Sequence, residues 1–248
     1  MKKWIWIIAL LLTTACSAGN AVSDSDVPTD AVCRTISYYD YGAPVIESAE
    51  VHDDWFNDAI IIGDMRVGSL ALYTDLASRG AEIIYDERLG IYSMKTSTIQ
   101  MSSATAYDAL LQSDRKKIYL WLGINELVYD SADWASVYAA IVSEIIQSHK
   151  DAEIYLLGEY HPLSINSMDG EALRAAVDAH NQALQKIAKE NRIYYLDMCD
   201  ALDGKDGVIE DSYVWGGYSL NPDGALKAVN YLSSHIVKEK EHVKTICE

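Results

Sequence analysis

The feature that most constrains the fold is an alternation of short apolar runs with segments of helical spacing. The apolar runs cover 59–62, 81–85, 118–122, 153–157 and 192–196, and the expected helices cover 67–78, 104–112, 133–149, 170–191 and 222–238. Apolar strands separated by helices are typical of a parallel sheet that is covered on both faces. We therefore predict an α/β fold, a three-layer α/β/α sandwich around a five-stranded parallel sheet, in a single domain.

The N-terminus has the layout of an export signal. Lys2 and Lys3 precede an apolar run over 4–12, and small residues lead to Cys16. This run is too short for a membrane-spanning helix, and its layout is typical of a signal that is removed from the mature chain. A cysteine after small residues resembles a bacterial lipoprotein site. We expect an exported protein, lipid-anchored through Cys16 at the extracellular face of the cell membrane; an ordinary signal peptide cut nearby is the alternative.

The remaining organisation follows from composition. Residues 1–16 are the expected signal peptide, 17–52 a tether and N-terminal approach, 53–240 the α/β domain and 241–248 a C-terminal tail. The formal net charge of −17 argues against nucleic acid as a partner, because phosphates are repelled by it.

Three cysteines follow the lipidation site. Cys33 and Cys247 lie near the chain ends, which suggests a clasp between them, but the sequence does not determine the pairing among Cys33, Cys199 and Cys247. Cys199 follows an apolar strand, and a buried small side chain is its favoured role. No cysteine or histidine spacing typical of a metal site is present, so we expect neither metal nor cofactor.

Polar and aromatic residues follow the ends of the predicted strands, where parallel strands present a shared edge. The candidates are Asp64, Met65 and Arg66 after the first strand, Asn125 and Glu126 after the third, Glu159 and His161 after the fourth, and Trp215 and Tyr218 before the last helix. Ligands of open α/β sheets bind at this edge. We expect these residues to line one cleft. The alternative for Asp64 and Arg66, which we favour over direct ligand contact, is a pair that braces the turn, and the alternative for Asn125 and Glu126 is a structural role that holds the loops together.

Several motifs at these positions resemble the SGNH, or GDSL-like, hydrolases. Ile61-Ile-Gly-Asp-Met-Arg66 resembles the first block of the family, which normally reads Gly-Asp-Ser. Gly90 stands where the second-block glycine is expected, and Leu122-Gly-Ile-Asn-Glu-Leu127 resembles the third block. Gly216-Gly-Tyr-Ser-Leu-Asn-Pro222 is similar to the last block, Asp-Gly-x-His-Leu-x-Pro. The resemblance implies a flavodoxin-like sandwich and an ester-hydrolase ancestry.

The same resemblance implies that the catalytic triad is missing. The serine position is Met65, the aspartate position is Gly216 and the histidine position is Ser219. A thioether has no proton to lose, so it cannot form an acyl-enzyme by this route. Gly90 and Asn125, which correspond to oxyanion-hole positions, are retained.

Two classes of function stay open. The first is a non-catalytic protein whose former ester cleft binds a small molecule or carbohydrate, for which Trp215 and Tyr218 offer ring faces. The second is an active ester hydrolase with relocated residues, in which Glu159 and His161 act as acid and base or hold a metal. A purely structural role in a surface complex is also open, and the 17 tyrosines and six tryptophans suit a core as well as a sugar-binding surface.

Overall fold

The computed structural model describes residues 33–48, 53–99, 103–165, 168–238 and 242–247. The leader, Cys16 and the first part of the predicted tether lie outside the described residues. The chain divides into two compact units, Ser37–Val243 and a smaller unit made of Met1–Ile36 with Lys244–Glu248. In the smaller unit the backbones of β1 (Cys33–Ser37) and β11 (Val243–Cys247) pair in a two-stranded sheet. The side chains of Cys33 and Cys247 are not described, so a bond between them stays a prediction.

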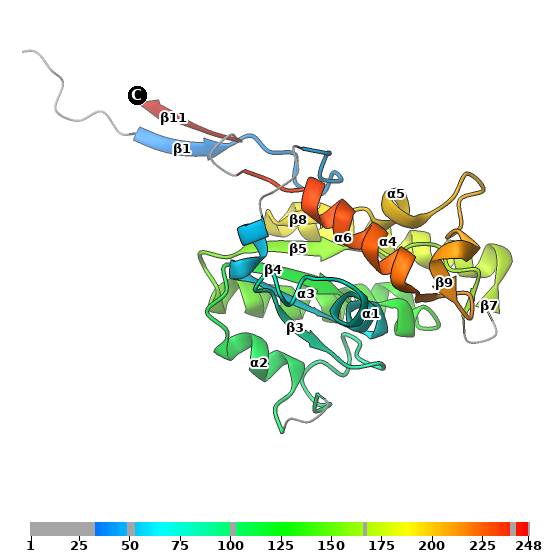
Figure 1. The fold of residues 1–248 in the computed structure, drawn as a ribbon. Coiled ribbons are helices and arrows are strands. Elements are labelled where there is room, and N and C mark those ends of the chain that lie inside the picture. The colour runs from blue at the N-terminus through cyan, green and yellow to red at the C-terminus, as the bar shows by residue number, and fades with distance from the viewer. Residues whose placement is uncertain (1–32, 49–52, 100–102, 166–167, 239–241, 248) are drawn as a thin grey trace, which may run out of the picture. The chain divides into compact units, whose positions relative to one another are not determined.

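A five-stranded parallel sheet forms the centre of the larger unit (Figure 1). Its strands, in spatial order, are β3 (Glu82–Tyr85), β2 (Ala59–Gly63), β4 (Lys117–Trp121), β5 (Glu153–Leu157) and β8 (Tyr194–Leu196). The predicted α/β fold is confirmed. The strand order reverses between β2 and β4, so a topological switch point lies where Gly63 pairs with Trp121. Ligands of flavodoxin-like sheets bind at that edge.

Helices cover both faces of the sheet (Figure 1). One core cluster joins α1 (Met65–Tyr73), α5 (Met198–Leu202) and α6 (Pro222–Ser234) to alternate residues of the strands, such as Ile61 and Trp121. The other joins α2 (Ala106–Gln112), α3 (Ser131–Ser148) and much of α4 (Gly170–Asn191) to the intervening residues, such as Ile62 and Leu120. Successive strand residues point to opposite faces, which is why nearly every position of these strands is apolar.

Short elements complete the larger unit between these helices and strands. They are η1 (Asp53–Asp58), η2 (Ile124–Glu126), η3 (Asp211–Tyr213), and two antiparallel pairs, β6 (Ser164–Ile165) with β7 (Met168–Asp169) and β9 (Val214–Trp215) with β10 (Ser219–Leu220).

Element boundaries differ from the prediction where side chains cap the backbone. Helix α1 begins at Met65 and not at Val67, because the Asp64 carboxylate accepts the N–H of Arg66 and caps the helix. It ends at Tyr73 and not at 78, since Thr74 Oγ1 bonds back to the Leu70 carbonyl. Helix α5, which Asp197 caps, was not predicted because five residues are too few to show a helical period.

The described part of the N-terminal approach packs against the larger unit. Val45 is 2% exposed, and its N–H donates to the carbonyl of Tyr195 at the edge strand β8. Residues 38–48 therefore belong with the domain, although the predicted boundary was placed at 53. The two aliphatic residues Val45 and Ile46 are too few to show the period of a strand or a helix.

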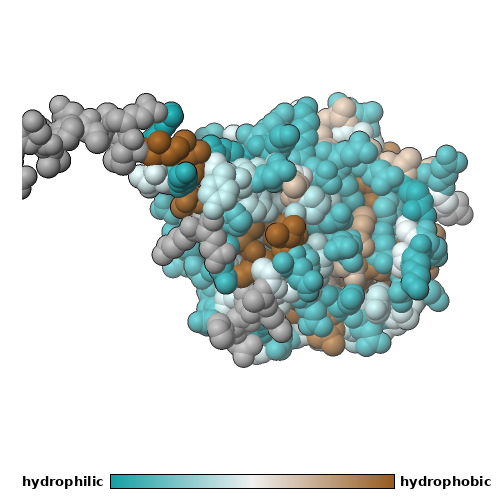
Figure 2. Space-filling view, turned by 90° about the horizontal axis from the view of Figure 1, so that it is seen from above, coloured by the Kyte–Doolittle hydropathy of each residue, from teal (hydrophilic) through white to brown (hydrophobic). Residues whose placement is uncertain are grey.

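Large apolar side chains are exposed at several places on the described surface. The exposed large apolar side chains are scattered along the chain, and the face in Figure 2 is mainly hydrophilic with small hydrophobic groups. None of the helices among the described residues has both the length and the apolar character needed to cross a bilayer.

His180 is buried between α3 and α4 without a compensating hydrogen bond. Its ring stacks on Trp134 with centroids 3.8 Å apart and an angle of 3° between the planes. Neither ring nitrogen has a hydrogen-bond partner among the described residues. Burial, aided by the positive charge of Arg66, lowers the pKa of His180 from 6.5 to about 4. The imidazole is therefore neutral in the folded protein at neutral pH.

We predict that His180 makes the protein sensitive to acid. The unfolded chain takes up a proton at this residue near pH 6.5 and the folded chain only near pH 4. Folding stability is therefore retained above the unfolded pKa and lost as the pH falls through this window. Relative to His180→Phe, which keeps a flat ring against Trp134, the wild type should lose up to about 3 kcal/mol between pH 6.5 and 4. Urea unfolding of both proteins across this range measures the difference, and parallel curves would contradict the prediction.

Candidate functional site

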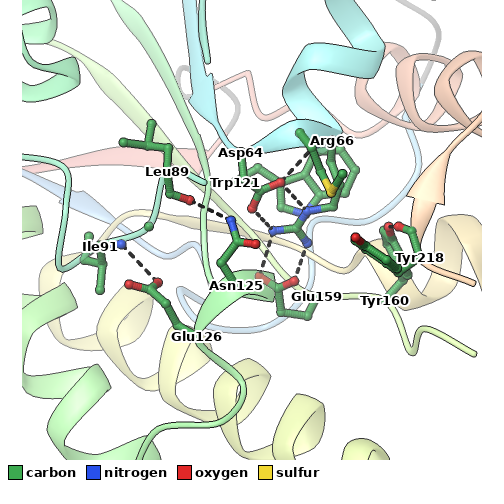
Figure 3. A network of polar contacts seen from close by, with 12 residues as sticks. Asp64, Arg66, Leu89, Ile91, Trp121, Asn125, Glu126, Glu159, Tyr160 and Tyr218 are labelled. Atoms are coloured by element: carbon green, nitrogen blue, oxygen red, sulfur yellow. Dashed lines mark hydrogen bonds and ion pairs between the residues drawn. The ribbon is translucent and has the colours of Figure 1, made fainter. Parts of the chain in front are cut away.

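The turn between β2 and α1 is held by a buried ion-pair network around Arg66 (Figure 3). The Asp64 carboxylate accepts hydrogen bonds from Arg66 Nε at 2.8 Å and Nη2 at 2.6 Å. On its other edge the guanidinium contacts both carboxylate oxygens of Glu159, which follows β5. All three side chains are fully buried. The network thus ties the end of β2 to the end of β5 across the intervening strand β4.

Aromatic rings complete the surroundings of this guanidinium. Its central carbon lies 4.8 Å from the ring centroid of Trp121 and 5.8 Å from that of Tyr160. Cation–π contacts gain strength when water is excluded. Burial by itself lowers the pKa of Arg66, but the charges of Asp64 and Glu159 outweigh it, so the net pKa is raised. Burial raises the pKa of Glu159 to about 7. The charge of Arg66 opposes this shift, whereas the charge of Asp64, the second carboxylate that contacts the same cation, adds to it.

Glu126 is a second buried carboxylate and organises the loop around Gly90. It accepts hydrogen bonds from the N–H groups of Ile91 and Tyr92 and from Trp134 Nε1, at 3.0, 3.1 and 3.0 Å. A Cβ at Gly90 would lie 2.5 Å from this carboxylate, which explains the glycine. Burial raises the pKa of Glu126, and these three hydrogen bonds oppose the shift. The contacts of Glu126 are therefore structural. Its side chain also lines a pocket of about 390 Å³, together with Tyr92 and Tyr129.

The two oxyanion-hole positions have internal hydrogen-bond partners. The Gly90 N–H donates to Ser93 Oγ at 3.0 Å. Asn125 Nδ2 donates to the carbonyls of Glu87 at 3.3 Å and Leu89 at 3.1 Å (Figure 3 draws the second bond). An oxyanion needs donors directed at the reacting oxygen. In this conformation both groups instead stabilise the 87–93 loop.

Of the three positions that the resemblance equates with the triad, Met65 and Ser219 line an open cleft. Ser219 Oγ is 3.7 Å from Met65 Sδ, so the residues at the serine and histidine positions are in contact. Gly216 lies in the turn of the β9–β10 hairpin with φ of +61°, and a Cβ there would meet nothing within 4 Å. No acid, base or nucleophile stands at these three positions.

The cleft at Met65 has an aromatic rim that sequence analysis only partly found. It encloses about 270 Å³ and is lined by Met65, Gly68, Ser69, Leu72, Tyr73, Tyr85, Glu87, Trp215, Ser219 and Leu220. Trp215 is 54% exposed and meets the 40%-exposed Tyr73 edge-to-face, with centroids 5.7 Å apart. Trp215 pairs with Ser219 across the hairpin, which brings both to this side. Residues that follow Met65 at intervals of one helical turn lie on the same face of α1, and this spacing could have indicated Tyr73.

Most of the polar residues predicted to line the cleft do not line it. Asp64, Arg66, Glu126 and Glu159 are buried in the networks described above, because their charges find partners inside the protein. Tyr218 lies in the turn between β9 and β10, packs against the core and is not among the residues that line the cleft; its carbonyl accepts a hydrogen bond from the Tyr160 hydroxyl. Of the predicted ligand-contacting residues, Trp215 remains in the cleft.

His161 lies in a separate cluster and does not pair with the Glu159 side chain. Its Nδ1 is 2.6 Å from Asp203 Oδ2, and its Nε2 is 3.1 Å from Asp178 Oδ1. Hydrogen bonds to Asp203 raise the pKa of His161, with burial opposing them. Cys199 donates its S–H to the Glu159 carbonyl at 3.0 Å and is a free thiol of intermediate burial, less buried than predicted. Among the described residues, no hydroxyl of the Met65 cleft bonds to His161.

Comparisons with known proteins agree with this architecture. Residues 68–226 match the GDSL-like Lipase/Acylhydrolase family. The fold is similar to a GDSL-like lipase from Bacteroides thetaiotaomicron, with a TM-score of 0.53 and 11% identity over 68% of this chain and 83% of that one. A comparison with curated protein sequences gives no match.

Two further solved structures are esterases of carbohydrates. A family two carbohydrate esterase from Clostridium thermocellum aligns with a TM-score of 0.52 and 12% identity, over 71% of this chain and 61% of that one. An acetyl-xylooligosaccharide esterase from Geobacillus aligns with a TM-score of 0.52 and 13% identity, over 76% and 94%. At these identities the likeness concerns the fold. Because the family match covers more than half of the sequence, the chain belongs to the GDSL-like lipase/acylhydrolase family.

We predict that removing the Arg66 charge destabilises the whole domain. In Arg66→Gln, Asp64 and Glu159 remain buried as two carboxylates without a cation, which typically costs about 3–5 kcal/mol. Glu159→Gln should cost less, because it leaves the paired contact between Arg66 and Asp64 in place and its amide imitates a protonated acid. Urea unfolding at pH 7 measures both. An Arg66→Gln loss below that of Glu159→Gln would contradict the structural role of the cation.

Proposed function

We propose that this protein is a non-catalytic member of its family whose former ester cleft binds a ligand, carbohydrate or cell-wall derived. The observation that supports it best is the contact between Met65 and Ser219, which puts a thioether and a hydroxyl where the reaction needs a nucleophile and a base. Loss of a triad costs about 10⁶ in turnover, and the residual rate from binding and oxyanion donors is small. Here the retained Gly90 and Asn125 donors also have internal acceptors.

The relocated-hydrolase alternative has less support. It needs Glu159 and His161 to act on a substrate in the same cleft. Glu159 is fully buried against Arg66, and the two nitrogens of His161 face Asp203 and Asp178. A general base must reach the proton that it removes, directly or through one water. Neither side chain lines the cleft at Met65.

A carbohydrate suits the shape and chemistry of the cleft. Trp215 and Tyr73 present exposed rings at its rim, and Met65 provides an apolar floor. Sugar rings have apolar C–H faces that pack on aromatic rings, with hydroxyls left over for hydrogen bonds. About 270 Å³ is small for a ligand pocket, which suits one sugar unit or side group of a longer chain lying on the open surface.

The proposal includes a cellular location. The leader over 1–16 and Cys16 support export and attachment to the extracellular face of the membrane by a lipid. The high negative charge makes attraction to anionic headgroups an unsuitable means of attachment, so the lipid would supply the membrane affinity. A sugar-binding domain held at the cell surface would meet cell-wall fragments or extracellular polysaccharides.

We predict that the unmodified protein hydrolyses acetyl and short acyl esters no faster than a heat-denatured sample. The triple variant Met65→Ser, Gly216→Asp, Ser219→His should raise turnover by about 10²-fold or more, because it supplies nucleophile, base and orienting acid together. Gly216→Asp has free space, although its positive φ adds about 1 kcal/mol of backbone strain. Release of p-nitrophenol measures both. Turnover by the unmodified chain that His161→Gln abolishes would overturn the non-catalytic proposal.

We also predict that oligosaccharide binding depends on the aromatic rim. Calorimetric titration with cello- and xylo-oligosaccharides and soluble peptidoglycan fragments should identify a binder. Trp215→Ala should then weaken binding about 10-fold or more, the loss expected of a central aromatic contact. Tyr38→Ala is the matched control, since Tyr38 is 62% exposed and does not line the cleft. Equal affinities of the wild type and Trp215→Ala would place the ligand elsewhere.

A further inference from the structure

The histidine after strand β5 is held between two carboxylates. The backbone N–H of His161 donates to Asp203 Oδ1 at 3.1 Å, and its Nδ1 lies 2.6 Å from Oδ2 of the same carboxylate. Its Nε2 lies 3.1 Å from Asp178 Oδ1. The side chains of His161 and Asp203 are 12% and 9% exposed, whereas that of Asp178 is 54% exposed. The ring is thus fixed in position by three separate contacts.

Such an arrangement requires a positive charge at the ring. A neutral imidazole has a hydrogen on one nitrogen and a lone pair on the other. With a carboxylate at each nitrogen, the neutral ring would direct one lone pair at a carboxylate oxygen. A second proton on the ring, or a metal cation between one ring nitrogen and its carboxylate, removes this repulsion. The Nε2–H donating to Asp178 is the carboxylate–histidine contact that commonly orients a metal ligand.

A third donor of a metal-binding type lies at the same place. Cys199 Sγ is 3.5 Å from His161 Nδ1, and one donor atom each from His161, Cys199 and Asp203 lie within 4.8 Å of one another. For tetrahedral zinc with usual bond lengths, a nitrogen and a sulfur ligand are separated by about 3.5 Å, and a nitrogen and an oxygen by about 3.3 Å. The Nδ1–Sγ distance already fits. The Asp203 oxygen would need to withdraw by about 0.7 Å from its hydrogen-bonded position.

We propose that His161 Nδ1, Cys199 Sγ and a carboxylate oxygen of Asp203 form a binding site for a Zn²⁺ ion. Nitrogen and thiolate donors favour zinc over Mg²⁺ or Ca²⁺, which prefer oxygen. Three protein ligands leave the fourth position for water. His161 also lines a pocket of about 390 Å³. Arg174, which also lines this pocket, is bonded to the carbonyls of Gly207 and Asp206.

The exchange of protons for the ion conserves charge. A metal-free cluster of an imidazolium, two carboxylates and a thiol would have a net charge of −1. When Zn²⁺ binds, the Nδ1 proton and the thiol proton leave to solvent, and the Zn²⁺, thiolate and two carboxylates again sum to −1. Since the total charge of this partly buried cluster is unchanged, binding avoids an uncompensated buried charge.

Nucleophilic chemistry at Cys199 is a weaker explanation of the same cluster. Burial, with the nearby carboxylates of Asp203 and Asp197, raises the pKa of the Cys199 thiol. A reactive cysteine needs the reverse, a positive surrounding that favours the thiolate. Asp203 also occupies the side of the ring that would accept the thiol proton. A metal ion supplies the missing positive charge directly. The inference is independent of what binds at Met65.

Metal binding to the purified, metal-free protein tests this directly. We expect Zn²⁺ to bind at one ion per chain in competition with a chromophoric chelator, and to raise the thermal unfolding temperature. Co²⁺ in place of Zn²⁺ should give the near-ultraviolet charge-transfer band of a cobalt–thiolate bond. Neither result depends on a variant that might misfold. Absence of stoichiometric binding, or bound Co²⁺ without a thiolate band, would overturn the proposal.

Variants assign the ligands. Cys199→Ser and His161→Gln should each weaken zinc binding by about 100-fold or more, while Asp178→Asn, which changes only the contact to Nε2, should weaken it about 10-fold to 100-fold. The double variant Cys33→Ser, Cys247→Ser is the matched control, because it removes the other two cysteines that follow Cys16 and should keep full affinity. Binding that survives Cys199→Ser but is lost in this control would place the ion elsewhere and overturn the assignment. Circular dichroism verifies that each variant is folded.

Discussion

The interaction on which the structure depends is the buried contact of Arg66 with Asp64 and Glu159. It joins the first turn of α1 to the end of β5, and so fixes the loops on both sides of the topological switch point. A guanidinium suits this task because its planar set of donors can meet two carboxylates at once. Desolvation makes such a network a poor source of net stability, but loss of one member leaves a charge buried and unpaired. The geometry of the cleft edge is therefore specified by charge as well as by packing.

This network is independent of the three positions that the resemblance equates with the catalytic triad. None of the three triad-equivalent positions takes part in it: Met65 and Ser219 contact each other at the cleft, and Gly216 has no side chain. The loop that contains Gly90 is held by Glu126 and Asn125 through bonds to backbone groups. Substitution at the reacting positions thus leaves the architecture intact. A family fold and retained loop motifs are compatible with a protein that binds without cutting.

Two polar clusters share the residues that follow β5. The Glu159 side chain faces Arg66, whereas its carbonyl accepts bonds from Asn181 and from the Cys199 thiol. His161, two residues later, faces Asp203 and Asp178. Glu159 therefore belongs to the structural network, and His161 belongs to the cluster for which we propose zinc.

The sequence by itself determined the layers, because periodicity and apolar runs are local properties that each segment carries within itself. The strand β5 and the helix α4 agree with their predicted bounds. The loss of the triad, inferred from Met65, Gly216 and Ser219, stays a prediction. Only the tertiary structure decided which polar residues face the cleft. Arg66 and Glu159 are 93 positions apart, and His161 and Asp203 are 42 apart, so no local pattern reveals that they meet. Burial and pairing depend on how distant segments pack. The charged side chains of Arg66 and Glu159 are therefore buried, whereas Tyr73, on the face of α1 that carries Met65, lines the cleft.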